Sequence, residues 1–382
     1  MALRVLSVFG TRPEAIKMAP IVRQLSATDA IESRVCVTAQ HRQMLDQVLE
    51  LFEIRPDYDL DLMRANQSLP ELSAAIFSNL DPVFTDFKPD WILVQGDTTT
   101  VAIASLLAYY RRIKVGHVEA GLRTNDKWQP FPEEINRRVA SVTADLHFAP
   151  TEWSRQNLLL ENTPDAHIVV TGNSVIDALE YVSKQVEPQE IKVLLDRLGG
   201  SAFGTGKKRL ILVTAHRREN FGKPIEDICL ALKEIASRGD VEIVYPVHLN
   251  PNVQEPVNRH LGGREHITLL QPLDYLPLVH LMKHATLILT DSGGIQEEAP
   301  AFGIPVLVMR ETTERPEGVD AGTLKLVGTN TSRIVEEATR LLEDETAYAK
   351  MARASNPYGD GHTAERIVEA LLKRTDNLSQ RV

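Results

Sequence analysis

Cysteine is scarce in this chain: Cys36 and Cys229 are the only two among 382 residues. Each lies in an apolar run, so we expect both to pack in the core rather than to form a disulfide or hold a metal. No group of histidine and cysteine has the spacing of a zinc site. We therefore predict no bound metal.

Other absences narrow the class of protein. No apolar run approaches the roughly 20 residues that cross a membrane, and Met1 leads straight into a strand pattern without a signal peptide. We expect a cytoplasmic protein with no membrane partner. The net charge of −10 gives no reason to expect nucleic acid binding. No Gly-x-Gly-x-x-Gly motif follows the first strand and no Gly-x-Ser-x-Gly motif occurs, so we predict no dinucleotide cofactor.

What the chain does contain is a regular alternation of short apolar runs and helical patterns. The runs that read as strands are 4–9, 35–38, 91–95, 113–118, 146–149, 167–171, 210–214 and 241–245, with further strands around 287 and 306. This alternation predicts an α/β fold with parallel, doubly wound, Rossmann-like sheets. The length exceeds what one core supports, so we expect two domains with a ligand site in the cleft between them.

We place the N-terminal domain at 1–172 and the C-terminal domain at 173–363. The remaining residues, 364–382, are expected to form a helix and tail that pack back on the N-terminal domain. A polar stretch at 184–190 is a second candidate for the hinge between the domains.

The stretch from Thr290 to Pro300 reads as strand end, glycine turn and helix. It places Ser292, Gly293 and Gly294 at a helix N-terminus, where free N–H groups and the helix dipole favour an anion. Glu298 follows about one helical turn later, placed to accept hydrogen bonds from ribose hydroxyls. A tight turn without a ligand is the alternative, but the added glutamate favours a nucleotide diphosphate site.

Charged residues also follow several predicted strands of the first half. Arg12 and Lys17 follow the first strand and could hold a sugar phosphate, or could be surface cations of a helix. Asp97 and Glu119 end two further strands, and Glu133 opens a helix. Because ligands bind at the carboxyl ends of parallel strands, we expect these carboxylates to converge for proton transfer. An acid in a first helical turn, such as Glu133, also has a purely structural explanation in the helix dipole.

Strand ends of the second half carry positive groups. His216 follows a buried strand and could donate a proton or a hydrogen bond to a phosphate. Arg217 lies beside it, Arg315 follows a later strand, and His248 follows the strand that ends near Tyr245. A satisfied histidine under a cationic loop is the structural alternative for His216.

With these residues in view, the chain resembles the non-hydrolysing UDP-N-acetylglucosamine 2-epimerases of bacteria. The matching stretches run in family order through nearly the whole chain: 9–17, 96–99, 117–124, 132–137, 214–220 and 290–298. The resemblance implies a glycosyltransferase-B-like fold and a homodimer. It also implies interconversion of UDP-GlcNAc and UDP-ManNAc without cofactor or metal, for synthesis of cell-surface polysaccharides. The implied route removes the C2 proton, expels UDP to leave 2-acetamidoglucal, and adds UDP back.

Roles are carried over by motif. The resemblance makes Asp97, Glu119 and Glu133 the acid and base candidates, and His216 the residue that assists the diphosphate. The residues implied to bind UDP-sugar are Arg12, Lys17, Ser292, Gly293, Gly294, Glu298 and Arg315.

Many bacterial members also bind a second UDP-GlcNAc as an activator. The matching positions here are Gln40, Gln43, Gln67, Glu134, Arg217 and His248. Asn66 stands where relatives carry an arginine, which leaves the strength of this regulation open. Leu278 stands where some relatives place an aromatic residue near the uracil, so we expect weaker stacking.

Three other functions are consistent with parts of this pattern. A retaining glycosyltransferase of the same fold would need an acceptor site, and the three carboxylates argue against it. A hydrolysing epimerase would release free ManNAc and UDP. A non-catalytic UDP-sugar sensor would bind UDP-GlcNAc without exchanging the C2 proton, and the intact carboxylates argue against it as well.

Overall fold

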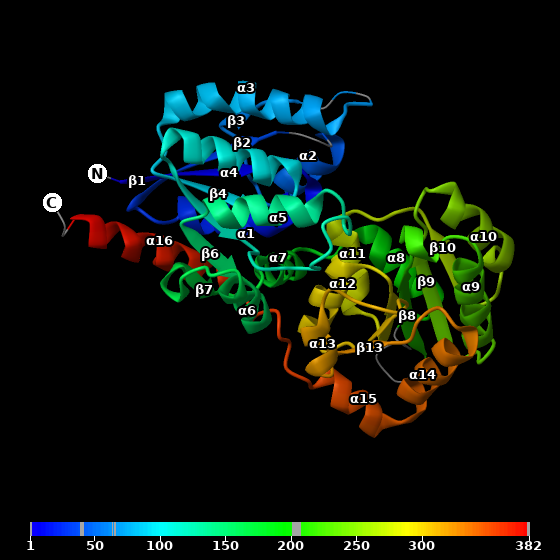
Figure 1. Ribbon diagram of the computed structural model, residues 1–382. Helices are drawn as coiled ribbons and strands as arrows, with labels where there is room; N and C mark the ends of the chain where they lie inside the picture. The colour runs from blue at the N-terminus through cyan, green and yellow to red at the C-terminus, as the bar shows by residue number, and fades with distance from the viewer. Residues whose placement is uncertain (1, 39–41, 63, 65, 201–207, 380–382) are drawn as a thin grey trace. The chain divides into compact units, whose positions relative to one another are not determined.

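The computed structural model describes residues 2–38, 42–62, 64, 66–200 and 208–379. Contacts divide the chain into two compact units, residues 1–178 with 358–382, and residues 179–357 (Figure 1). The chain therefore passes between the units twice, and the second unit is one continuous segment. The first passage lies within helix α7, Ser174–Ser183, and the second lies just before Tyr358, whereas the sequence suggested boundaries at 172 and 363.

The first unit is built on a seven-stranded parallel sheet with the order β3-β2-β1-β4-β5-β6-β7. Its strands are β1 Leu3–Phe9, β2 Ile31–Val37, β3 Tyr58–Asp59, β4 Trp91–Gln95, β5 Lys114–Val118, β6 Leu146–Ala149 and β7 Ile168–Val170. The central strands are apolar throughout, as β4 shows with all five residues buried. A parallel sheet covered by helices on both faces requires this continuous apolar pattern.

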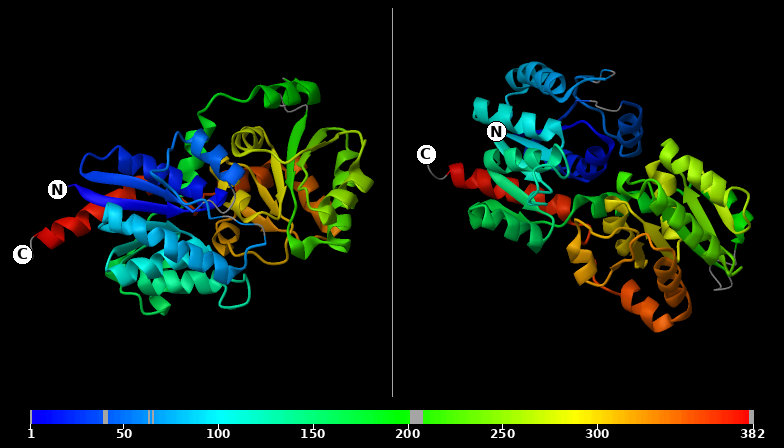
Figure 2. Two further views of the ribbon diagram at one scale, coloured as in Figure 1. Left: turned by 90° about the horizontal axis from the view of Figure 1, so that it is seen from above. Right: turned by 45° about the vertical axis from the view of Figure 1, so that its right-hand side comes forward.

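Helices cover both faces of this sheet (Figure 2). They are α1 Arg12–Ser26, α2 Arg42–Leu51, α3 Leu69–Phe87, α4 Thr99–Arg111, α5 Glu133–Thr143, α6 Glu152–Leu160, α7 Ser174–Ser183 and α16 Thr363–Ser379, with a 3₁₀ turn at Asp165–His167. Neighbouring helices α3, α4 and α5 pack side by side, and α1 packs between α2 and α16. The chain's last helix thus completes the first unit.

The second unit carries a six-stranded parallel sheet with the order β10-β9-β8-β11-β12-β13. Its strands are β8 Arg209–Thr214, β9 Val241–Pro246, β10 Ile267–Leu270, β11 Leu287–Thr290, β12 Val306–Val308 and β13 Leu324–Leu326. Its helices are α8 Gln189–Leu198, α9 Lys223–Ala236, α10 Pro251–Leu261, α11 Tyr275–Lys283, α12 Gly293–Glu298, α13 Pro316–Asp320, α14 Thr331–Glu343 and α15 Glu345–Ala352, with 3₁₀ turns at Arg218–Asn220 and Ala299–Phe302.

Both cysteines are free and fully buried, Cys36 in β2 and Cys229 in α9, as the sequence predicts. Among the described residues, none of the helices is long and apolar enough to cross a membrane.

Candidate active site

Two neighbouring strands of the first unit end in the predicted carboxylates. The register pairs Gln95 of β4 with Val118 of β5, so Asp97 and Glu119 follow adjacent strand ends. Gly96 separates Gln95 from Asp97 and adopts φ +80°, and its N–H donates to the Val118 carbonyl over 3.0 Å. The structure therefore brings Asp97 and Glu119 to the same edge of the sheet, as expected.

The Glu119 side chain is only 7% exposed, and its carboxylate is held by several charged or polar donor groups. Lys17 of α1 forms an ion pair with it, Gln95 donates to its other oxygen, and Asn173 Nδ2 donates over 3.0 Å. The backbone of Glu119 lies in the left-handed region at φ +63°, which is costly for a residue with a Cβ atom. Backbone strain of this kind concentrates at functional sites.

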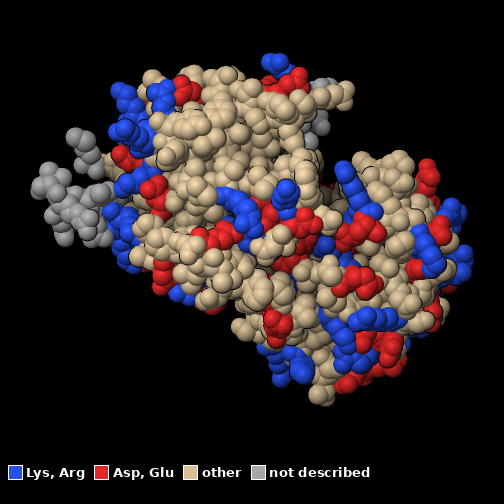
Figure 3. All heavy atoms as spheres, viewed as in Figure 1, with Lys and Arg blue, Asp and Glu red and all other residues tan. Residues whose placement is uncertain are grey.

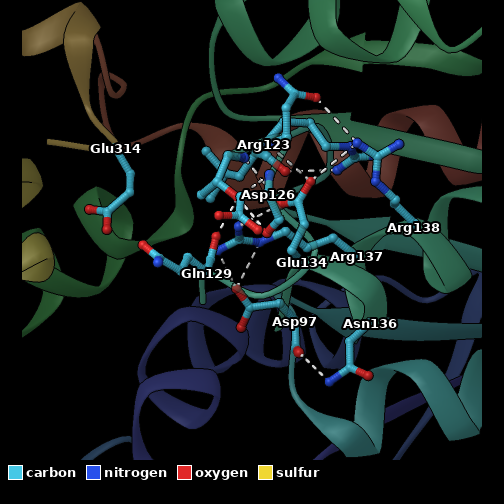
Figure 4. A network of polar contacts seen from close by, with 12 residues as sticks. Asp97, Arg123, Asp126, Gln129, Glu134, Asn136, Arg137, Arg138 and Glu314 are labelled. Carbon is cyan, nitrogen blue, oxygen red and sulfur yellow. Dashed lines mark hydrogen bonds and ion pairs between the residues drawn. The ribbon is translucent and has the colours of Figure 1, made fainter. Parts of the chain in front are cut away.

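Asp97 is held from helix α5 (Figure 4). Its carboxylate pairs with the guanidinium of Arg137 at 2.7 Å, and its backbone carbonyl accepts from Asn136 Nδ2 at 2.9 Å. Glu133 is half-buried at the first position of the same helix. The predicted acids Asp97 and Glu133 are therefore joined through the N-terminal turns of α5.

His117 lies on β5 directly before Val118 and is fully buried. Its Nε2 lies 2.7 Å from the carbonyl oxygen of Gly96, which requires the Nε2–H tautomer. Burial lowers the pKa of this imidazole to about 4, so the ring is neutral at pH 7. The neutral ring can therefore hold the turn that carries Asp97.

Glu14 is a buried carboxylate that the sequence did not single out. It caps α1 by accepting from the N–H groups of Gly10 and Thr11, and its other oxygen accepts from the Thr98 hydroxyl over 2.7 Å. Burial raises the pKa of this carboxyl group. Glu14 thus joins the start of α1, where the half-buried Arg12 lies, to the turn after β4.

In the second unit, Asp291 organises the loop after β8. It is fully buried, and its Oδ2 accepts from the backbone N–H groups of His216 and Arg217, each over 2.8 Å, and from Asn220 Nδ2 over 3.0 Å. Its Oδ1 lies 3.3 Å from Nδ1 of His216. Burial, together with the charge of Arg217, lowers the pKa of His216, although Asp291 opposes that shift.

The Ser-Gly-Gly turn follows β11 as predicted, with Ser292 at the N-cap of α12. A Cβ atom on Gly293 would lie 2.8 Å from the guanidinium of Arg315, so the missing side chain admits this arginine. Arg315 Nε donates to the buried carboxylate of Glu297 over 2.7 Å. Glu298 is also buried, beside Gly294.

Comparison with known proteins gives a consistent family. Residues 23–372 match the family model described as UDP-N-acetylglucosamine 2-epimerase. A Yersinia pestis UDP-N-acetylglucosamine 2-epimerase is 62% identical over 97% of this chain and 98% of its own length. The chain belongs to the UDP-N-acetylglucosamine 2-epimerase family. The predicted family and the predicted fold class, two Rossmann-like domains of the glycosyltransferase-B-like type, are confirmed.

Solved structures of UDP-N-acetylglucosamine 2-epimerase relatives agree with this assignment. The enzyme from Neisseria meningitidis, in a crystal structure bound to UDP-GlcNAc, superposes with a TM-score of 0.88 and is 52% identical over 97% of this chain and all of that one. An S. aureus protein in a structure with UDP gives a TM-score of 0.86 at 46% identity, over 98% of this chain and 97% of that one.

The six positions that family resemblance assigns to an activator site have different surroundings. Gln40 and the side chain of Gln43 lie outside the described residues, and Gln67 is half-buried between β3 and α3. Glu134 is fully buried and accepts from the N–H groups of Thr124 and Asn125 as well as from two arginines (Figure 4).

The remaining two activator positions lie together in the second unit. Arg217 is half-buried next to His216, and the exposed ring of His248 stacks on the ring of His216 with centroids 5.6 Å apart. In the part of the chain that the structure describes, no group of three or more His, Cys, Asp or Glu side chains could hold a metal ion.

Proposed function

We propose that this chain interconverts UDP-GlcNAc and UDP-ManNAc by inverting the configuration at C2. The observation that supports this most directly is the pair of carboxylates, Asp97 and Glu119, that ends adjacent strands β4 and β5. Membership of the epimerase family and the UDP-GlcNAc bound by the N. meningitidis relative support the same substrate.

The proposed route is elimination followed by re-addition. The C2 proton is not adjacent to a carbonyl group, so its removal requires the leaving group to assist. A carboxylate of the first unit takes the C2 proton while the bond between C1 and the diphosphate oxygen breaks, giving 2-acetamidoglucal and UDP. The diphosphate oxygen then adds back to C1, and a second acid delivers a proton to the opposite face of C2. Asp97, Glu119 and Glu133 supply these acids and bases.

Cations hold both proposed acid and base carboxylates in place. Lys17 is paired with Glu119, and Arg137 is paired with Asp97. In this arrangement Lys17 orients Glu119 in addition to the anion-binding role expected from the sequence. Arg12 is proposed to bind the diphosphate from the start of α1.

The second unit is proposed to hold UDP. The N–H groups of Gly293 and Gly294 and the guanidinium of Arg315 would stabilise charge that develops on the departing diphosphate. His216 would donate from Nε2 to the same oxygens, because Asp291 near Nδ1 favours the protonated ring once an anion binds. Ser292 and Glu298 would bind the nucleotide, with Glu298 accepting from ribose hydroxyls.

A homodimer is the proposed assembly. Figure 3 shows a broad surface over α3, α4 and α5 with few charged side chains. Large apolar side chains lie exposed on α4 and α5, including Tyr109 at 63%, Tyr110 at 64% and Val142 at 87%. Patches of this kind mark protein interfaces. Light scattering on the wild type and on Tyr110→Arg would test this, because a dimer through α4 predicts monomers for the variant.

Activation by a second UDP-GlcNAc is also proposed, through Gln40, Gln43, Gln67, Glu134, Arg217 and His248. The stacking of His248 on His216 offers a direct physical link from this site to the diphosphate. Replacement of His248 by alanine should then flatten a sigmoidal dependence of rate on UDP-GlcNAc. Hyperbolic kinetics in the wild type would contradict the proposal.

The deciding experiment is proton NMR of UDP-GlcNAc with the enzyme in deuterated water. We expect UDP-ManNAc to appear with deuterium at C2, and Asp97→Asn to lose this exchange. Asp29→Asn, an exposed acid of the same unit, is the matched control and should stay active. Demonstrable binding without exchange or epimerisation in the wild type would refute the epimerase proposal, and release of free ManNAc would indicate a hydrolysing enzyme.

A further inference from the structure

Asn173 connects a catalytic candidate to the place where the chain leaves and re-enters the first unit. It is 3% exposed, and its Nδ2 donates to Oε1 of Glu119 over 3.0 Å. Its Oδ1 accepts from the N–H of Val175 over 3.1 Å at the start of α7. Its own backbone N–H donates to the carbonyl oxygen of Tyr358 over 2.6 Å.

Two glycines fix this position. Gly172 adopts φ +88°, and a Cβ atom there would lie 3.2 Å from the Cα atom of Gly359. Gly359 adopts φ +139°, and its added Cβ would lie 3.4 Å from the backbone nitrogen of Asn173. The outgoing chain at Asn173 and the returning chain at Tyr358 are therefore in backbone contact, which leaves the Asn173 amide little freedom.

We propose that Asn173 is a positioning residue that sets the orientation and the proton affinity of the Glu119 carboxylate. The inference rests on the proposed function, in which Glu119 exchanges a proton with C2. The oxygen of the Asn173 amide is already used by Val175, so its NH₂ group must point at Glu119. A neutral donor fixed in this way holds one carboxylate oxygen and stabilises the charged form that acts as a base.

Charged groups from the surrounding elements also act on Glu119. Lys17 of α1 pairs with it directly, and Asp97 follows the adjacent strand with its partner Arg137 from α5. His117 on β5 is neutral at pH 7. A negative charge introduced at position 173 would lie at hydrogen-bond distance from Glu119, and its effect would add to that of these groups.

Asn173→Asp separates the two functions of this side chain. Aspartate keeps an oxygen for the Val175 N–H, so the start of α7 remains capped, but it replaces the donor to Glu119 by a second carboxylate. Two carboxylates in contact cannot both ionise easily, so the pKa of the pair rises. We expect the acidic limb of the kcat–pH profile to move up by about one pH unit or more, so that kcat at a pH on this limb falls about tenfold. KM should change by less than about threefold, because Asn173 does not hold the nucleotide.

Asn173→Ser is the second variant, and Asn258→Asp is the matched control. Serine keeps an oxygen that can cap α7 but cannot reach Glu119 and adds no charge, so the acidic limb should move up by less than in Asn173→Asp. Asn258 is an exposed residue of α10, where the same change should leave the profile unaltered. Solvent deuterium exchange at C2 and near-ultraviolet circular dichroism should be recorded for each protein.

The outcomes distinguish the inference from the function on which it rests. A wild type that neither epimerises UDP-GlcNAc nor exchanges its C2 proton would refute the proposed function itself. An active wild type together with variants that keep the wild-type pH profile would overturn the role of Asn173 alone. If Asn173→Asp does not fold, the kcat–pH profile of Asn173→Ser is the test. An acidic limb that stays at its wild-type position would then overturn the role of Asn173.

Discussion

Two buried histidines on adjacent strands should make the first unit sensitive to mild acid. His117 of β5 and His147 of β6 are paired in register and almost completely buried. Burial lowers the pKa of His117 to about 4 and that of His147 to about 3. Both values lie below the ordinary 6.5, so the unfolded chain binds more protons. The folded state therefore keeps its full stability above pH 6.5 and loses stability as the pH falls below that value.

The magnitude follows from the two pKa values of each ring. At pH 5 the His147 ring is almost fully protonated in the unfolded chain and neutral in the folded chain. This difference lowers the free energy of unfolding by about 2 kcal/mol at pH 5, and by about 0.4 kcal/mol at pH 6.5. Each histidine should therefore remove about 1.6 kcal/mol from the free energy of unfolding between these pH values. Carboxylates with a lowered pKa, such as Glu314 at about 2, act only at lower pH.

Urea unfolding followed by tryptophan fluorescence measures this effect in one unit. All three tryptophans, Trp91, Trp128 and Trp153, belong to the first unit. The variant His147→Leu should lose about 1.6 kcal/mol less than the wild type between pH 6.5 and 5, because comparison of the two proteins cancels the other titrating groups. His362→Gln, at an exposed position of the same unit, should behave like the wild type. Parallel losses in wild type and His147→Leu would refute a neutral, buried His147.

Three further predictions concern the candidate site. Glu119→Gly should be more stable than Glu119→Ala by about 1 kcal/mol, the reverse of the usual order, because only the alanine keeps a Cβ atom at φ +63°; thermal unfolding of the two inactive variants checks this, and equal stability would exclude strain. Gly293→Ala should lower kcat about tenfold, since its Cβ displaces the Arg315 guanidinium that stabilises the departing diphosphate; an unchanged kcat in steady-state kinetics would contradict this. Asp291→Asn should lower kcat about a hundredfold while the protein stays folded, because the neutral amide no longer favours the protonated His216 ring that donates to the diphosphate; a kcat within twofold of wild type would show that the charge of Asp291 is unimportant.

The central strands could be predicted from sequence because they are buried on both faces. β4 and β8 consist almost entirely of apolar residues, and the sequence places both within a residue of their bounds. The edge strands β3, β10 and β13 were not predicted. β3 has two residues, and only the first residue of β10 and of β13 is buried, so none of them carries a continuous apolar run.

The residues of the candidate site also fall into two groups, those that the sequence alone could identify and those that it could not. Asp97 and Glu119 could be found because they lie within two residues of the ends of strands β4 and β5, and the carboxyl ends of parallel strands meet at one edge. Asp291 and Asn173 could not be assigned roles, because their partners are remote: 75 residues separate Asp291 from the His216 backbone, and 54 separate Asn173 from Glu119. Only the fold brings these side chains together.

The return of the chain to the first unit has a consequence for synthesis on the ribosome. Helix α1 packs against α16, and Asp177 accepts from the N–H of Ala364. The last helix therefore emerges roughly 340 residues after α1, which takes roughly 20–70 s at typical rates of translation. During that interval the second unit, a continuous segment, can fold first while the apolar face of α1 still lacks its partner. The first unit can therefore be completed only after the whole second unit has been synthesised, and a stop codon before α16 would leave the first unit incomplete rather than the second.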